Sequence, residues 1–227
     1  MAVRIKWYGH AAFRITSDGG PTLIVDPYTP DLLGYAPIRD HADVVVISSA
    51  TDEAHCRADL IGGNPVVVNA LDVARDGGRR TAHGLEFLAE EASEWDGRSD
   101  READANAMYR WAMNGIAFAH MGDVGNPLSE RQTDFLAGVD VLFALAGGYL
   151  TIALPDLITA IERTAPKLVI PMHFRTLTYK PRNTMWIEAL LSHFDDENID
   201  FACAHEIDLE RASLPSRTRV LVMDYAR

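Results

Sequence analysis

The chain has 227 residues, of which 48% are apolar and 24% charged, and these proportions exclude a disordered, collagen-like or coiled-coil protein. Acidic residues (33) outnumber basic ones (21), and the net charge of −12, without a basic stripe, argues against a nucleic-acid partner. No apolar run reaches the roughly 20 residues that span a membrane, the N-terminus lacks a signal-peptide core, and two cysteines make no disulfide framework. We therefore expect a cytoplasmic protein that has neither nucleic acid nor membrane as a partner.

Short strands are predicted in the first half of the chain, because β-branched and aromatic residues gather between turn signals such as the Asp-Gly-Gly-Pro segment at 18–21. The expected strands are 3–6, 12–16, 22–25, 44–47, 66–68 and 85–89. Residues 93–106 are polar and charged and predict a solvated loop. The Asn114-Gly115 pair between the apolar segments 108–113 and 116–120 predicts a β-hairpin.

The second half of the chain alternates predicted strands and helices. Ser129 and Gln132 have the spacing of a capping box for a helix that ends near residue 137. Pro155 suits the first turn of a second helix, and Asn183 can cap a third. Between them lie two apolar strands, 141–145 and 168–170. Strands followed by strand–helix units predict one α/β (α+β) domain over residues 1–227.

Unusual polar residues follow three of the predicted buried strands. His55 lies in the polar segment 48–55 after the first, Asp123 follows the hairpin, and His173 follows strand 168–170. Ligands of layered α/β folds bind outside the carboxyl ends of strands, so the three segments together predict a site for a small molecule. Taken singly, each residue could equally be a turn or helix-capping residue.

Several segments resemble the metallo-β-lactamase superfamily. The Trp-Tyr-Gly-His-Ala-Ala-Phe segment at 7–13 and the Leu-Ile-Val-Asp-Pro-Tyr segment at 23–28 are similar to its opening strands. The branch they most resemble is that of small metal-dependent hydrolases, which includes L-ascorbate-6-phosphate lactonase. Segments 119–125, 146–152 and 169–174 match further landmarks in family order. The resemblance implies a four-layer αββα sandwich with a metal site at one edge.

The family's H-x-H-x-D-H motif is degenerate in this chain. It falls on residues 49–54, where the sequence is Ser-Ala-Thr-Asp-Glu-Ala, and His55 stands one place after it. The next family histidine falls near residues 90–93, where this chain has none. Three histidines bind the first of the family's two metals: the two at the start of the motif, replaced here by Ser49 and Thr51, and the one near residues 90–93. Because all three are missing, the resemblance implies that the first metal position is lost.

The second metal position keeps a ligand set by resemblance. Glu53, Asp123 and His173 are its expected ligands, for one Zn (or Mn or Fe) ion. Asp123, His55 and His10 are the expected catalytic residues, with either histidine transferring a proton. We thus predict a metallo-β-lactamase-fold protein with a depleted metal site that hydrolyses an ester, lactone or amide.

Other interpretations remain open at this stage. A binding or scaffold protein could retain the fold without any metal or catalysis, and Ser49 or Thr51 could act as a nucleophile beside a histidine. Arg175 and Tyr149 are the expected substrate-binding residues, although Arg175 could belong to a solvated surface. The apolar loop 149–154 could contact the pocket or a second subunit of a homo-oligomer. By resemblance, His10 and Asp26 could orient metal ligands, but His10 could equally be a satisfied core histidine and Asp26 a turn residue before Pro27.

Overall fold

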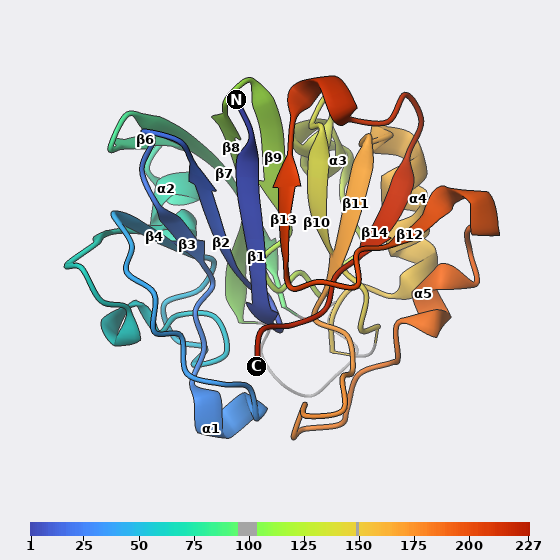
Figure 1. Cartoon of the computed structure of the whole chain (residues 1–227), viewed down its shortest axis with the longest axis horizontal. Helices are drawn as coiled ribbons and strands as arrows, with labels where there is room; N and C mark the ends of the chain where they lie inside the picture. The colour runs from blue at the N-terminus through green and yellow to red at the C-terminus, as the bar shows by residue number, and fades with distance from the viewer. Residues whose placement is uncertain (95–103, 149) are drawn as a thin grey trace.

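Two mixed β-sheets form the centre of the computed structural model, which describes residues 1–94, 104–148 and 150–227 (Figure 1). The first sheet contains, in spatial order, β13 (Glu206–Leu209), β1 (Val3–Gly9), β2 (Ala12–Ser17), β3 (Leu23–Val25), β4 (Val44–Ile47) and β5 (Val66–Asn69). The second contains β12 (Ile199–Phe201), β14 (Arg219–Val222), β11 (Leu168–Met172), β10 (Val141–Leu145), β9 (Ile116–His120), β8 (Ala105–Met113), β7 (Leu85–Ser93) and β6 (Arg79–Ala82). Each sheet contains antiparallel strands and a parallel set. The parallel set is β3, β4 and β5 in the first sheet and β9, β10, β11, β14 and β12 in the second.

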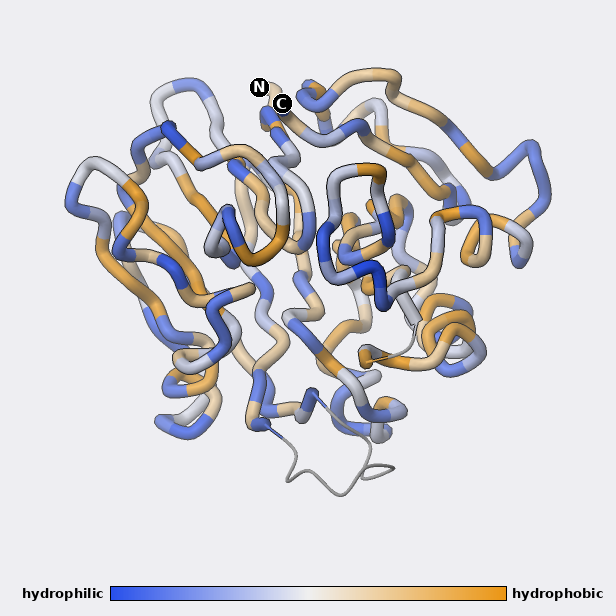
Figure 2. Tube along the Cα trace, turned by 90° about the horizontal axis from the view of Figure 1, so that it is seen from below, coloured by the Kyte–Doolittle hydropathy of each residue, from blue (hydrophilic) through white to orange (hydrophobic). Residues whose placement is uncertain are grey.

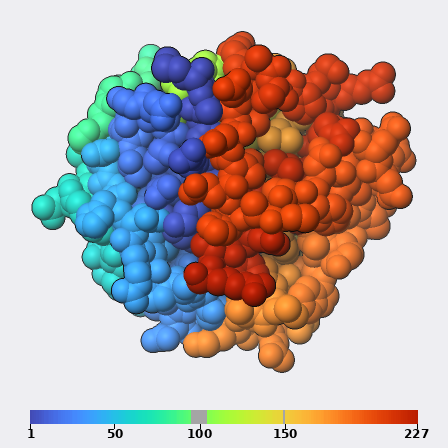
Figure 3. Space-filling model, in the orientation of Figure 1, coloured from blue at the N-terminus to red at the C-terminus, as the bar shows by residue number. Residues whose placement is uncertain are grey.

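The helices pack mainly against the second sheet. They are α1 (Pro30–Leu33), α2 (Ala70–Arg75), α3 (Glu130–Leu136), α4 (Leu154–Thr164) and α5 (Glu188–Leu191), with 3₁₀ turns at Ala58–Leu60, Asp196–Asn198 and Arg211–Ser213. In Figure 1, α3, α4 and α5 lie beside the second sheet, and Figure 3 shows the first and last parts of the chain on opposite sides of one face. The arrangement confirms the predicted α/β sandwich. Within the described residues, no helix combines the length and apolarity needed to cross a membrane.

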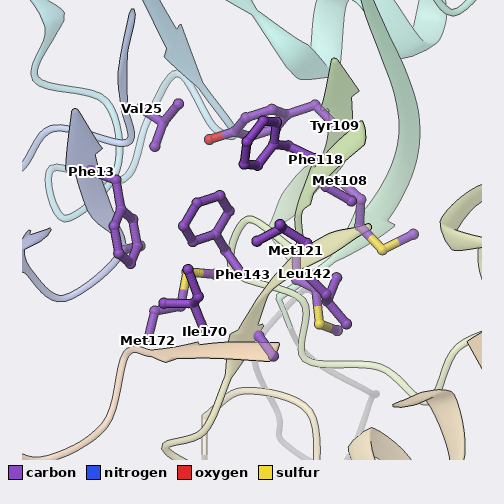
Figure 4. Packing of buried hydrophobic residues seen from close by; sticks show 14 of the residues in the cluster. Phe13, Val25, Met108, Tyr109, Phe118, Met121, Leu142, Phe143, Ile170 and Met172 are labelled. Atoms are coloured by element: carbon purple, nitrogen blue, oxygen red, sulfur yellow. The ribbon is translucent and has the colours of Figure 1, made fainter. Parts of the chain in front are cut away.

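Aromatic side chains from both sheets meet in the core. Phe13 of β2 and Phe143 of β10 are fully buried, and their ring centroids lie 4.4 Å apart (Figure 4). Phe118 of β9 stacks nearly parallel to Phe143, at 6.3 Å and 18°. Burying each such ring contributes about 1.5–3 kcal/mol to folding, so these contacts fix the two sheets against one another.

Most predicted elements are confirmed, including the hairpin and the capping box. Asn114 and Gly115 both have positive φ, as a tight hairpin turn requires, and Ser129 and Gln132 exchange the two bonds of a capping box. The predicted cap at Asn183 is wrong, because α5 begins later and the Asn183 side chain accepts a bond from Tyr179. β7 and β8 extend into the expected loop at 93–106, whose central part, 95–103, lies outside the described residues.

The turn between β1 and β2 and the segments that follow β4, β9 and β11 meet at one end of the sandwich. The Ser48 carbonyl accepts a bond from the Ala107 amide (3.1 Å), and the His10 carbonyl accepts one from the His173 amide (3.0 Å). In Figure 1, α1 and the segment after β11 (orange) lie at this lower end, which Figure 2 views from below. The polar residues predicted from sequence are therefore brought to one place by the topology.

Candidate metal centre

Five ionisable side chains gather at this end of the sandwich. We call them the histidine–aspartate cluster: His10, Asp52, His55, Asp123 and His173. His10 comes from the turn between β1 and β2, Asp52 and His55 follow β4, Asp123 follows β9, and His173 follows β11. All except Asp52 are buried. The cluster thus draws on both sheets.

The donor atoms of the cluster have the spacing of metal ligands. His55 Nε2 lies 3.7 Å from Asp123 Oδ2 and 3.9 Å from Asp52 Oδ2, and His173 Nε2 lies 3.2 Å from Asp123 Oδ1. Two ligand atoms about 2.1 Å from one tetrahedral ion are roughly 3.4 Å apart. The observed distances bracket that value, and the donors form two sets that share His55, Asp52–His55–Asp123 and His10–His55–His173, each with its ligand atoms within 4.8 Å of one another.

Several buried polar atoms of the cluster lack any hydrogen-bond partner in the part of the chain that the structure describes. They are His10 Nε2, His55 Nε2, His173 Nδ1 and Asp123 Oδ1, which forms an ion pair with His173 Nε2 at 3.2 Å. An unsatisfied buried polar atom costs about 1–3 kcal/mol, and native proteins contain few of them. Four in one cluster indicate atoms kept free for a ligand, and imidazole and carboxylate together suit a divalent cation.

A second group of buried polar residues lies next to the cluster and holds it in place. We call this group the support network: Asp26, Ser48, Tyr109 and His120. The Asp26 carboxylate accepts bonds from the Ser48 amide (2.8 Å), the Ser48 hydroxyl (2.7 Å) and the Tyr109 hydroxyl (3.2 Å). It also accepts a bond from His55 Nδ1 at 2.9 Å. Because Nδ1 donates to Asp26, Nε2 of His55 is turned toward Asp123.

His120 in the support network is fully satisfied. Its Nε2 donates to the Ala11 carbonyl (2.9 Å), and its Nδ1 accepts a bond from the Gly122 amide (3.0 Å). Gly122 has φ +61°, and a Cβ there would meet Asn106 Oδ1 at 2.5 Å and the Ala107 carbonyl at 2.7 Å. The close approach requires glycine, and with His120 it fixes the loop that carries Asp123.

The charges of the cluster are strongly coupled. Burial disfavours the imidazolium form of His55, but three surrounding carboxylates outweigh it and raise its pKa to about 10. Burial also works against ionisation of Asp123, but the two adjacent histidines outweigh it and hold the pKa below its ordinary value. A proton on His55 therefore supplies positive charge among these carboxylates, and a cation would displace it.

Backbone strain is concentrated at the same place. His10, Asp26 and His173 have φ of 52°, 40° and 58°, in the left-handed region that residues other than glycine rarely adopt. Such conformations cost on the order of 1–3 kcal/mol and persist where the surroundings impose them, often at functional sites.

The structure brings Asp123, His173, His55 and His10 together but leaves Glu53 outside. The Glu53 side chain is 63% exposed, and it accepts a bond from the Thr29 hydroxyl at 3.0 Å. Asp52 lies in the cluster instead. Its Oδ1 accepts the Ala54 amide (2.9 Å) and its carbonyl accepts the His55 amide (2.9 Å), a tight turn that directs Asp52 and His55 to the same side. The Asp-x-x-His spacing of Asp52 and His55 is the sequence pattern that could have identified this pair.

Of the residues expected to bind substrate or act as nucleophile, Arg175 and Ser49 do not belong to the cluster. Arg175 lies over the ring of Trp186, with its guanidinium carbon 4.8 Å from the ring centroid. Tyr149 lies outside the described residues. The Ser49 hydroxyl contacts the Thr51 hydroxyl (3.4 Å) and accepts bonds from backbone amides of its own loop. These contacts give Ser49 a structural role in the loop.

Two further residues near the cluster were missed from sequence. Glu94 is buried and one of its oxygens has no partner in the described parts of the chain. Burial, then the charges of Asp123 and Asp52, raise its pKa to about 8. The family comparison pointed to residues 90–93, directly before it. Tyr179 stacks on His10, with ring centroids 5.7 Å apart and planes at 17°.

The amino-acid sequence is similar to those of known proteins. The model of the β-lactamase superfamily domain matches residues 4–173. A metal-dependent hydrolase of Staphylothermus marinus is 24% identical over 209 residues, which cover 78% of this chain and 86% of that protein. One of Hyperthermus butylicus is 26% identical over 200 residues, covering 76% of this chain and 83% of its own.

Solved structures share the fold along the whole chain. The crystal structure of a candidate Zn-dependent hydrolase of the metallo-β-lactamase superfamily from Thermotoga maritima has a TM-score of 0.76 at 26% identity, covering 99% of this chain and 100% of that one. A metallo hydrolase of Ignicoccus hospitalis has a TM-score of 0.63 at 21% identity, covering 100% of this chain and 97% of that one, which shows likeness of fold.

Proposed function

The chain belongs to the β-lactamase superfamily, and we propose that it is a metal-dependent hydrolase with one divalent cation bound at the histidine–aspartate cluster. One observation carries the proposal. Donor atoms of Asp52, His55 and Asp123 all lie within 4.8 Å of one another, and the His55 donor is buried with no hydrogen-bond partner in the described part of the chain. The relatives named as metal-dependent hydrolases support the same function.

Asp52, His55, Asp123 and His173 would hold the cation. Two carboxylates and two imidazoles suit Zn, Mn or Fe. A single ion is favoured because Ser49 and Thr51 stand where the family motif has two histidines of the first metal position. When bound, such an ion polarises a carbonyl group and lowers the pKa of a coordinated water.

The residues of this chain contribute orientation around that chemistry. Asp26 holds Nδ1 of His55 and thereby directs Nε2 into the cluster. His120 holds the Gly122 amide and so positions the neighbouring Asp123. We infer a small-molecule substrate with an ester, lactone or amide bond, and the resemblance to the ascorbate-phosphate lactonase branch favours lactones.

Metal analysis combined with hydrolysis of a panel of esters, lactones and amides tests the proposal. Wild-type protein should contain about one equivalent of a divalent metal and hydrolyse at least one class of probe. Asp123→Asn should lose the metal and reduce hydrolysis at least about 100-fold. Asp140→Asn is the matched control, because Asp140 and Asp123 are each 9% exposed but Asp140 bonds Lys167 and Ala117 instead.

A non-catalytic binding or scaffold role is the second candidate, and the loss of the motif histidines at Ser49 and Thr51 favours it. Under this alternative, wild-type protein supplemented with Zn, Mn or Fe would bind no stoichiometric metal. It would also hydrolyse none of the probes. That pair of results would replace the hydrolase proposal.

A further inference from the structure

His10 lies apart in sequence from every other residue of the cluster but beside His55 and His173 in space. Its ring centroid is 3.8 Å from that of His173 and 4.9 Å from that of His55. Donor atoms of the three histidines all lie within 4.8 Å of one another. The three imidazoles are therefore close enough to bind one ion.

The surroundings of His10 provide no other use for its ring nitrogen. The side chain is 2% exposed, and Nε2 has no hydrogen-bond partner among the residues that the structure describes. His120, equally buried and nearby, has both nitrogens bonded and needs no ligand. The difference separates a histidine that stabilises the fold from one whose donor atom is held free.

The backbone keeps His10 in this position at a cost. Its φ of 52° is left-handed, and its carbonyl accepts the His173 amide, which joins two cluster residues through the main chain. Tyr179 packs against the ring. A buried ring held in a strained conformation beside two other imidazoles has the geometry of a preorganised ligand.

We propose that His10 is a direct ligand of the divalent cation, together with His55 and His173. Three imidazoles would then compensate for the histidines that the family motif has lost, with His10 recruited from the turn between β1 and β2. The inference rests on the proposed function because it requires the cation. A nitrogen-rich set favours Zn, Fe or Co over Mg or Mn.

Two substitutions at His10 separate coordination from packing. His10→Asn removes the imidazole with a residue that tolerates positive φ, and His10→Phe keeps an aromatic ring beside Tyr179 without a donor atom. His83→Asn is the matched control, since His83 has φ 47° but is exposed at a turn. Zn affinity is measured by chelator competition, and the ligand field by the visible spectrum of the Co(II) form.

Both His10 variants should bind Zn at least about tenfold more weakly and change the Co(II) spectrum, while His83→Asn changes neither. If both bind Zn and Co(II) as wild type does while Asp123→Asn loses the metal, the role of His10 is refuted and the proposed function stands. Wild-type protein that binds neither ion would refute both.

A measurement on the wild-type protein tests the proposal even if the His10 variants fail to fold. Protein labelled with ¹⁵N at histidine and loaded with ¹¹³Cd should show cadmium–nitrogen coupling to three imidazoles, those of His10, His55 and His173. Coupling to only the latter two would overturn the proposal.

Discussion

Two groups of buried polar residues lie side by side at one end of the sandwich and differ in how completely they are satisfied. In the support network, the Asp26 carboxylate accepts four hydrogen bonds and both nitrogens of His120 are bonded. In the histidine–aspartate cluster, His10, His55, His173 and Asp123 each keep an atom unpartnered among the described residues. Apart from Asp52, the residues of both groups are buried, so hydrogen bonding rather than depth distinguishes the group that stabilises the fold from the group that can bind a ligand.

The largest effect is expected from breaking the support network itself. Asp26→Asn removes a charged acceptor from two Ser48 donors and from His55, and it should lower the free energy of unfolding by about 3 kcal/mol. Urea denaturation in the presence of a chelator measures this. Asp123→Asn in the same conditions should cost less than Asp26→Asn, because Asp123 Oδ1 has no hydrogen-bond partner among the described residues. Equal losses in the two variants would erase the distinction between the two groups.

Metal binding should complete the cluster and stabilise the protein. Zn at 100 times its dissociation constant adds about 2.7 kcal/mol to the free energy of unfolding, because the ion binds the folded state. Thermal melts with Zn and with chelator measure the gain. His55→Ala should abolish it, whereas Asp140→Asn should preserve it. A gain of the same size in His55→Ala would indicate that Zn binds elsewhere.

Within the support network, single bonds should have graded effects. Tyr109→Phe removes only the hydroxyl that donates to Asp26 at 3.2 Å, and it should destabilise the protein by about 1.5 kcal/mol. Zn affinity should stay within about threefold of wild type, since the His55–Asp26 bond remains. Chemical denaturation and chelator competition on the same samples test both halves. A large loss of Zn affinity would mean that Tyr109 belongs functionally to the cluster.

The sequence predicts the elements of this fold better than the details of its site. Continuous apolar strands such as Val44–Ile47 and Val141–Leu145 are buried along their whole length, so a local pattern identifies them. Asp123 and His173 follow such strands directly, which places them at the sheet ends. The choice between Asp52 and Glu53 depends on a turn and on the Thr29 hydroxyl, and neither follows from spacing.

Residues brought together by tertiary packing could not be assigned roles in advance. His10 follows β1 and His173 follows β11, which are far apart in the sequence, so no local pattern predicts the contact between the two rings. The strands β12 and β13 are short and mostly exposed or half-buried, so their composition gave no strand signal, whereas the Arg-Val-Leu-Val segment of β14 carries one that was missed. Glu94 directly follows residues 90–93, where the resemblance to the family places a histidine, but the burial of Glu94 depends on the fold.

The smallest change in stability is expected at Glu94. Its carboxyl is buried beside the histidine–aspartate cluster, and one oxygen is unpartnered in the described part of the chain. Burial and the nearby carboxylates raise its pKa from 4.5 to about 8, so the folded protein retains a proton that the unfolded chain releases. The stability contributed by this proton is present below pH 4.5 and is lost as pH rises toward 8.

Glu94→Gln should therefore remove this fall, and at pH 8 the chelated variant should be more stable than wild type by at least about 1 kcal/mol, near the value of one pKa unit. Denaturation curves at pH 5, 6.5 and 8 measure the slope, with Glu162→Gln on the exposed surface of α4 as the control. Bound Zn should shrink the difference, since a cation offsets the charges of Asp52 and Asp123 that act on Glu94. A variant with the same pH slope as wild type would show that Glu94 ionises freely and stands apart from the cluster.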